Sequence, residues 1–349
     1  VIYVDDRRSI MQLVQFIIGI AVLIFFHEMG HFIFARLFKV EVEEFGIGFP
    51  PRIATLFEAG GTTFSINWIP LGGFVRIKGE NDPDVPGGLA SANPWVRLAV
   101  LSAGSLTNIF LGVMLAVILF LSIGEPIPDK IKVLDVAEGS PAEIAGLLPG
   151  DIIVEVQGQP IKNVDSLHTT IYDNLGKPIS ITFERNGEKR QVILTPRENP
   201  PENEGAIGIM MGEATQPTTL SRAIQRGVMI SVDYIRSLIL LPVNLAQGEI
   251  TTEEARPIGY KGMYDIYQQI SNPIYFFMII SLSLGFFNLL PIPALDGGRI
   301  FLILPEILLQ RRVPPSYENI IHMVGFLVLI ILLIYVNLQD FINPVQLPK

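Results

Sequence analysis

The feature that most constrains this chain is a pair of histidines inside a long apolar stretch. His27, Glu28 and His31 form an H-E-x-x-H motif, which follows the apolar run 16–26 and continues into the apolar run 32–35. Residues four positions apart share one face of a helix, so the two imidazoles can bind one metal ion. Ionisable side chains at membrane depth cost about 2.5–3.5 kcal/mol each on insertion scales. Their presence therefore indicates a functional site.

Composition indicates a membrane protein. The 349 residues are 49% hydrophobic and 17% charged, against about 25% charged in globular proteins, and the mean hydropathy is +0.45. The net charge of −9 comes without a basic tract, which argues against nucleic-acid binding. The chain has no cysteine, which excludes a disulfide framework and a thiol nucleophile.

Four stretches are long and apolar enough to cross a bilayer, which needs about 20 residues. The pattern predicts a first transmembrane helix within 1–38, a loop with a membrane-associated β-hairpin at 39–95, a second helix at 96–124, an inserted soluble domain at 128–212, an interfacial helix or linker at 213–271, a third helix at 272–300, a fourth at 318–338 and a tail at 339–349. A signal peptide is the alternative for the N-terminus, but the apolar run is too long and lacks a cleavage site.

Two regions leave alternatives open. Short strands are expected at 64–69 and 74–77 around a turn at 70–73, either as an ordinary surface hairpin or as backbone that lines a membrane cavity. The stretch 222–245 is apolar but is interrupted by Arg226, Asp233 and Arg236. An interfacial amphipathic helix fits these charges better than a fifth span.

Basic residues in the short loops set the expected orientation. They concentrate in the loops after the first and third spans, so these loops are expected in the cytoplasm, and both termini and the inserted domain outside. Arg7 and Arg8 argue weakly for the opposite orientation.

A catalytic zinc site usually has three protein ligands, and Asp296 is the expected third. The first and third spans run in the same direction if the second crosses between them, which places His27 and Asp296 at similar depth. His168 would lie on the other side of the membrane, and a structural role at the interface is expected for His322. The alternative for Asp296 is a helix cap.

The surroundings of Asp296 support a ligand role. Pro291 and Pro293 interrupt the third span, and Gly297 and Gly298 allow a tight turn. Broken helices at membrane depth must line something polar. Glu28 points away from the face shared by the histidines, so it is expected to be the general base that takes a proton from water and delivers it to the leaving amine.

These motifs resemble the site-2 protease family of intramembrane zinc metalloproteases, in the bacterial form with an inserted PDZ domain. The residues that carry the resemblance are 27–31, 72–80, 104–108 and 288–298, with 139–153 for the PDZ domain. Two features depart from the family pattern: one PDZ domain is found where many relatives have two, and Ser105 stands where relatives often have proline. The first departure puts an anti-sigma-factor substrate in doubt.

The resemblance implies a fold, a site and partners. The fold is a polytopic α-helical membrane protein of about four transmembrane helices, with a hairpin loop and an inserted α+β PDZ domain. The site consists of Zn²⁺ on His27, His31 and Asp296, with Glu28 as the catalytic acid and base. The implied partners are membrane lipid, transmembrane protein substrates and an upstream site-1 protease.

The resemblance also implies residues that contact the substrate. The hairpin, with Gly72, Gly73 and Phe74, adds to the unwound substrate as an edge strand. Asn288 hydrogen-bonds the substrate backbone, and Asn108 lies behind the ligands or lines the cavity.

The expected function is intramembrane cleavage of single-span proteins, such as anti-sigma factors or signal-peptide-like segments, in the bacterial inner membrane, with the active site toward the cytoplasm. Two alternatives are a non-catalytic PDZ scaffold with a vestigial metal site and a soluble-type protease that is merely tethered to the membrane.

Overall fold

The structure is a computed structural model that describes residues 6–201, 204–253, 255–270 and 272–345. The first residues of the predicted segment 1–38 and the last of the predicted tail 339–349 lie outside these ranges. The chain divides into two compact units, described separately below. The helical unit comprises the residues up to Leu119 and those from Ile224 onward, and the inserted domain comprises Phe120–Ala223.

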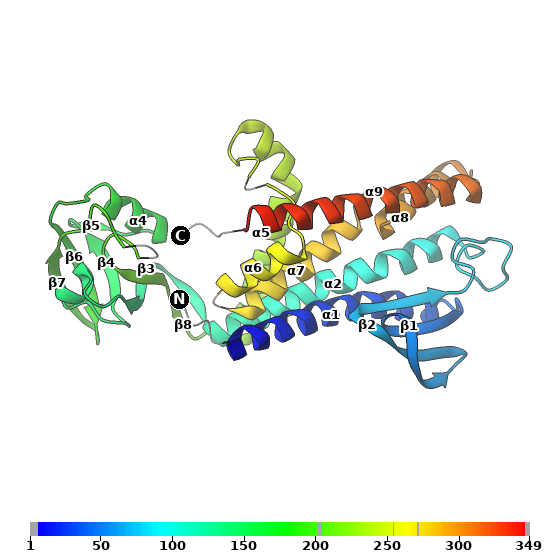
Figure 1. Ribbon diagram of the computed structural model, residues 1–349, viewed down its shortest axis with the longest axis horizontal. Helices are drawn as coiled ribbons and strands as arrows, with labels where there is room; N and C mark the ends of the chain where they lie inside the picture. Colours follow the sequence, from blue (N-terminus) through cyan, green and yellow to red (C-terminus); the bar gives the residue numbers. More distant parts are fainter. Residues whose placement is uncertain (1–5, 202–203, 254, 271, 346–349) are drawn as a thin grey trace. The chain divides into compact units, whose positions relative to one another are not determined.

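Long helices dominate the helical unit (Figure 1). They are α1 (Asp6–Leu37), α2 (Pro94–Ile123), α5 (Leu220–Gln247), α6 (Tyr260–Gln269), α7 (Pro273–Asn288), α8 (Asp296–Leu309) and α9 (Pro315–Ile342). Four of the described helices are long and apolar enough to cross a membrane: α1, α2, α5 and α9. The predicted class, a polytopic helical membrane protein with an inserted α+β domain, is confirmed.

The third predicted span, 272–300, is not one continuous helix, and it breaks where its prolines predict an interruption. The chain forms the 16-residue helix α7, leaves the helix after Asn288 and starts α8 at Asp296. Two prolines within this break cannot donate backbone hydrogen bonds, which explains why the helix does not continue. The helix α9 runs to Ile342, so it also includes the start of the predicted tail.

The helix α5 is one of the four long apolar helices, whereas α7, in the predicted third span, is shorter. The mean hydropathy of α5 is 1.5, against 2.4–2.6 for the other three, because charged residues interrupt it. Gly227 packs against Val117 of α2, and the Tyr234 hydroxyl lies 2.7 Å from Ser283 Oγ of α7. The opposite face exposes large apolar side chains, as a lipid-facing surface would.

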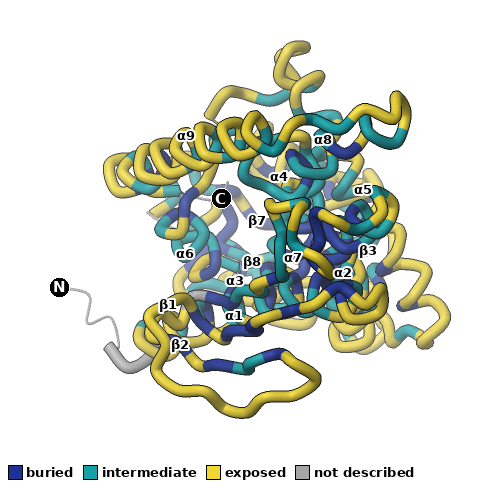
Figure 2. Tube along the Cα trace, turned by 90° about the vertical axis from the view of Figure 1, so that its right-hand side faces the viewer, coloured by how far each residue is buried: buried dark blue, intermediate teal, exposed yellow. Residues whose placement is uncertain are grey.

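Close helix contacts in this unit depend on glycines. A Cβ atom on Gly30 of α1 would lie 2.6 Å from the Ala103 carbonyl of α2, and one on Gly285 of α7 would lie 2.7 Å from the Ser105 carbonyl. Small residues let helix backbones approach closely in membranes, where packing drives association. Figure 2 shows that α9, in contrast, is exposed over much of its length.

The first loop forms a small sheet from β1 (Val42–Ala59) and β2 (Thr62–Ile77). The predicted turn at 70–73 is wrong, because the hairpin turn lies at Gly60 and Gly61, both at positive φ. Both strands bend, and residues 44–47 of β1 pair on one side with 63–66 and on the other with 73–76. The expected strands at 64–69 and 74–77 therefore flank β1 and do not pair with each other.

A buried carboxylate links the strands of this sheet. Glu44 is 3% exposed and accepts a hydrogen bond from Ser65 Oγ at 2.7 Å, and it pairs with Arg52 at 2.6 Å and Arg76 at 3.1 Å. Burial alone would raise the pKa of Glu44, but the Ser65 hydroxyl and the two guanidinium groups outweigh it and hold the pKa below its ordinary value.

The inserted domain is a six-stranded sheet with two short helices. Its strands are β3 (Glu125–Val136), β4 (Ile152–Val156), β5 (Gln159–Pro160), β6 (Ile179–Arg185), β7 (Glu188–Leu194) and β8 (Ile209–Gln216), and its helices are α3 (Pro141–Ile144) and α4 (Val164–Tyr172). The order is β7-β6-β4-β3-β8, with β5 paired to β4. The domain starts before the predicted 128 and ends after the predicted 212.

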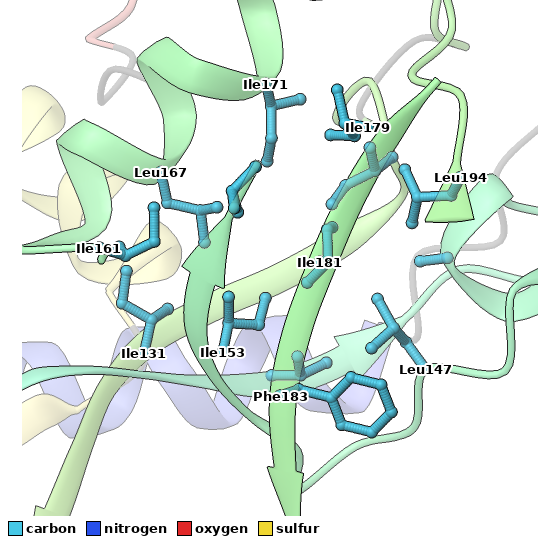
Figure 3. Close-up of a cluster of buried hydrophobic side chains, with 14 of the residues drawn as sticks. Ile131, Leu147, Ile153, Ile161, Leu167, Ile171, Ile179, Ile181, Phe183 and Leu194 are labelled. Carbon is cyan, nitrogen blue, oxygen red and sulfur yellow. The ribbon is translucent and has the colours of Figure 1, made fainter. Parts of the chain in front are cut away.

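Local sequence signals account for much of this domain. Asn186 and Gly187 both adopt positive φ in the two-residue turn between β6 and β7, as that dipeptide favours. Ser140 Oγ accepts the Glu143 amide and so caps α3. Figure 3 shows the core, where side chains such as Ile153, Leu167 and Ile181 are fully buried.

Candidate metal centre

The predicted ligands converge in the helical unit. His27 Nε2 lies 3.1 Å from Asp296 Oδ2, His31 Nε2 lies 3.3 Å from the same oxygen, and the two Nε2 atoms are 3.2 Å apart. Among the described residues, these three form the group of metal-binding side chains that could hold one ion. Two histidines of α1 thus meet an aspartate that lies more than 260 positions later in the sequence.

This arrangement fits a tetrahedral zinc ion. Zinc bonds to nitrogen and oxygen of about 2.0–2.1 Å require ligand atoms about 3.3–3.4 Å apart in a tetrahedron. The observed separations of 3.1–3.3 Å are close to this. The two histidines are buried and the Asp296 side chain is 21% exposed, so the group is not fully enclosed by protein.

A backbone carbonyl of α2 fixes the His31 ring. His31 Nδ1 lies 2.8 Å from the Val100 carbonyl oxygen, and a carbonyl can only accept. The proton must therefore be on Nδ1, which leaves the Nε2 lone pair for the metal. Sequence patterns could not show this contact, because any residue type at position 100 offers the same carbonyl.

Asn108 of α2 lies behind the other histidine ligand. Its Nδ2 is 3.5 Å from His27 Nδ1, and its buried Oδ1 has no hydrogen-bond partner. Metal binding through His27 Nε2 places a proton on Nδ1, and a 180° rotation of the amide would let Oδ1 accept that proton. This position favours a supporting role for Asn108 over direct substrate contact.

The turn before Asp296 requires the glycines that follow it. A Cβ atom on Gly297 would overlap the backbone of Leu289 and Leu290, and one on Gly298 would lie 2.9 Å from the Ile292 carbonyl carbon. Arg299 pairs with Glu80, which lies in the loop after β2. The start of α8 is thus held against both the broken segment and the first loop.

The end of the small sheet reaches the motif helix. Glu28 Oε2 accepts a hydrogen bond from the Val75 amide at 3.1 Å. Gly72 and Gly73 are buried beside α1, where a Cβ on Gly72 would lie 2.6 Å from Ile24 Cγ2 and one on Gly73 would lie 3.9 Å from Glu28 Cγ. The sequence analysis named the glycines but missed Val75, whose contribution is a backbone amide.

Two other predicted contact residues lie differently. The Phe74 ring packs over Gly46 and under the Arg76 guanidinium, 5.7 Å from the ring centroid. Asn288 is the last residue of α7 and is partly exposed. Their roles toward a substrate stay predictions.

Gly104 provides a test of the site that leaves the ligands themselves unchanged. A Cβ on this residue would overlap His31 Nε2 and lie 2.8 Å from Cδ2. We expect Gly104→Ala to push the ring from its position and to weaken zinc binding about 10–100-fold, the range seen when groups that orient ligands are changed. Zinc affinity by chelator competition checks this.

The matched control is Gly61→Ala, because nothing lies within 4 Å of a Cβ at that position, although its positive φ adds local strain. Zinc affinity unchanged in Gly104→Ala would contradict the assigned position of His31.

Comparisons with known proteins agree with this geometry. The family model "Peptidase family M50" matches residues 15–332. A Clostridium acetobutylicum protein named "Putative zinc metalloprotease" is 30% identical over 97% of this chain and 99% of its own length. The zinc metalloprotease RasP of Oceanobacillus iheyensis is 27% identical over 94% of this chain and 98% of its own length.

Solved structures were matched over the inserted domain. The PDZ domain of an SdrC-like protein from Listeria monocytogenes covers 25% of this chain and 92% of its own length, with 22% identity and a TM-score of 0.22. The family assignment rests on the match over most of the chain. This chain therefore belongs to peptidase family M50, the site-2 proteases, and is a zinc metalloprotease.

Proposed function

We propose that this membrane metalloprotease hydrolyses peptide bonds in or beside the transmembrane segments of single-span proteins. The observation that carries the proposal is the meeting of His27, His31 and Asp296 among apolar helices, next to a strand edge. A site made for soluble substrates would not need ligands inside a helix of mean hydropathy 2.4.

Glu28 performs the proton transfers in this proposal. Zinc bound by the three ligands would supply Lewis acidity to the attacking water and to the scissile carbonyl. Glu28 takes the proton from the water and delivers it to the leaving amine. The hydrogen bond from the Val75 amide holds the carboxylate in place beside the strand edge.

The edge of β2 presents the substrate. Peptide bonds in a helix are shielded by their own hydrogen bonds, so cleavage needs an extended segment. Residues 73–77 form the last part of β2, and the Val75 amide points away from β1 toward Glu28. A substrate strand added along this edge would pass beside Glu28, with Asn288 as a further backbone contact.

The inserted domain and the partners complete the proposal. In the bacterial cytoplasmic membrane, the PDZ domain lies outside and selects substrates by ectodomain size or by an exposed C-terminus. The metal site faces the cytoplasmic side. Anti-sigma factors or signal-peptide-like segments are the proposed substrates, after a first cut by a site-1 protease.

The catalytic role of Glu28 is tested with the purified full chain, in detergent, and a single-span substrate. Glu28→Gln is expected to lower the cleavage rate about 10²–10⁴-fold, because the proton acceptor is lost, while zinc stays bound. Glu43→Gln changes an exposed glutamate and should cleave like the wild type. Equal rates for both variants would refute the assignment.

The same assay separates the alternative functions. A scaffold with a vestigial site would bind the substrate without cutting it. A tethered soluble-type protease would cut a soluble peptide with the same scissile sequence as fast as the membrane-anchored one. The proposal requires much slower cleavage of the soluble peptide.

Val75→Pro tests the contribution of the strand edge. Proline removes one amide that does not pair with β1, and it is tolerated on edge strands. We expect cleavage to fall about tenfold or more while zinc affinity is unchanged, and Val75→Ala, which keeps the amide, to cleave like the wild type. Val75→Pro with normal cleavage would show that the edge is not used.

Membrane sidedness is tested by labelling, which the absence of native cysteines makes direct. Lys162→Cys places a thiol on the inserted domain and Glu58→Cys places one on the small sheet, and both positions are exposed. An impermeant maleimide added to intact cells is expected to label the first variant and, only after permeabilisation, the second. Labelling of both in intact cells would contradict the proposed orientation.

A further inference from the structure

The turn that carries Asp296 contains a residue in an unfavourable backbone conformation. Ala294 has φ +75, in the left-handed region that residues with a Cβ rarely adopt. Ala294 lies within a turn closed by the Leu295 amide, which donates to the Ile292 carbonyl at 3.2 Å, and just before this turn the Ile292 amide donates to the Leu290 carbonyl at 2.7 Å. Asp296 follows two residues after Ala294, so the path of this turn sets where the carboxylate points.

The helix α9 contacts this turn through two residues on one face. The Ala294 amide donates a hydrogen bond to His322 Nδ1 at 3.0 Å. Three positions later, Gly325 packs against Pro293, and a Cβ there would lie 2.9 Å from the Pro293 carbonyl carbon. The histidine and the glycine together form a contact surface for the turn. This surface lies on α9, whereas the proposed ligands lie on α1 and α8.

His322 is not a ligand in this arrangement. Its Nδ1 accepts the Ala294 amide, and it is absent from the group of side chains that could hold an ion. The sequence analysis expected an interfacial structural role for His322. The contact with the turn gives this side chain a more specific task.

We infer that His322 is a positioning residue: it holds Ala294 in the left-handed conformation and thereby keeps the Asp296 carboxylate against His27 and His31. Strained backbone persists only where the surroundings fix it, and the hydrogen bond that the Ala294 amide donates to His322 of α9 is a side-chain contact that does so here. This inference rests on the ligand role of Asp296 in the proposed function.

The test is a set of variants of the full chain whose zinc affinity is measured by chelator competition. His322→Leu removes the acceptor and is expected to weaken zinc binding about tenfold. His322→Asn keeps an acceptor oxygen near the position of Nδ1 and should bind zinc within about threefold of the wild type. Met323→Leu, on the exposed side of α9, is the matched control and should have no effect.

The decisive variant combines His322→Leu with Ala294→Gly. Glycine adopts positive φ without strain, so the turn no longer needs the hydrogen bond to His322 to keep its conformation. We expect the double variant to regain zinc affinity to within about threefold of the wild type. A residue that merely stabilised the fold would not be rescued in this way, so failure of the rescue would overturn the inference, as would normal zinc affinity in His322→Leu.

Hydrogen exchange of residues 289–298 in the zinc-free proteins provides a second readout. Exchange of this segment should rise in His322→Leu and return toward the wild-type rate in the double variant. Unchanged exchange in His322→Leu would contradict the claim that His322 holds this turn in place. Asp296→Ala distinguishes the two levels of the argument, because normal zinc affinity in that variant would refute the ligand assignment itself.

Discussion

The structure depends on the approach of three electron-rich atoms within 3.3 Å of one another, inside a bundle of apolar helices. Two imidazole nitrogens with free lone pairs and a carboxylate oxygen repel each other unless a proton or a cation lies between them. In surroundings of low polarity this repulsion is strong, so a zinc ion bound here would stabilise the helix arrangement as well as serve the chemistry. Gly30 and Gly104 allow the contact between α1 and α2 that brings His31 to its place.

Backbone groups, more than side chains, complete the site around these ligands. The Val100 carbonyl fixes the His31 ring, the Val75 amide binds Glu28, and the Ala294 amide binds His322. Each of these contacts is set by the path of the chain, so residue type at these positions carries little information about it. A membrane protein has reason to use them, because every backbone polar group that leaves a helix at membrane depth needs a partner.

This explains which parts the sequence could predict. The meeting of His27, His31 and Asp296 could be predicted from the spacing of the histidines and the depth of Asp296, because both depend on helix periodicity and on the number of spans. Their role as ligands stays a prediction. The pairing of the small sheet could not be predicted, since residues 44–47 bind two separate segments of β2 and local turn signals reveal neither. The character of α5 was left open because charged residues lower an otherwise apolar average, and only the packing of Gly227 and Tyr234 shows which face is buried.

The proposed zinc site can reach charge neutrality through Glu28. Two neutral imidazoles, the Asp296 carboxylate and a divalent cation sum to one positive charge, and an ionised Glu28 brings the total to zero. Asp296 is also the first residue of α8, where the helix dipole favours its negative charge. Net charge is costly among apolar helices, so a neutral total suits this position. In the proposed mechanism Glu28 takes its proton from water within the site, so a hydroxide replaces the water and the net charge does not change. Proton transfers first to Glu28 and then to the leaving amine would therefore avoid a build-up of net charge among the apolar helices.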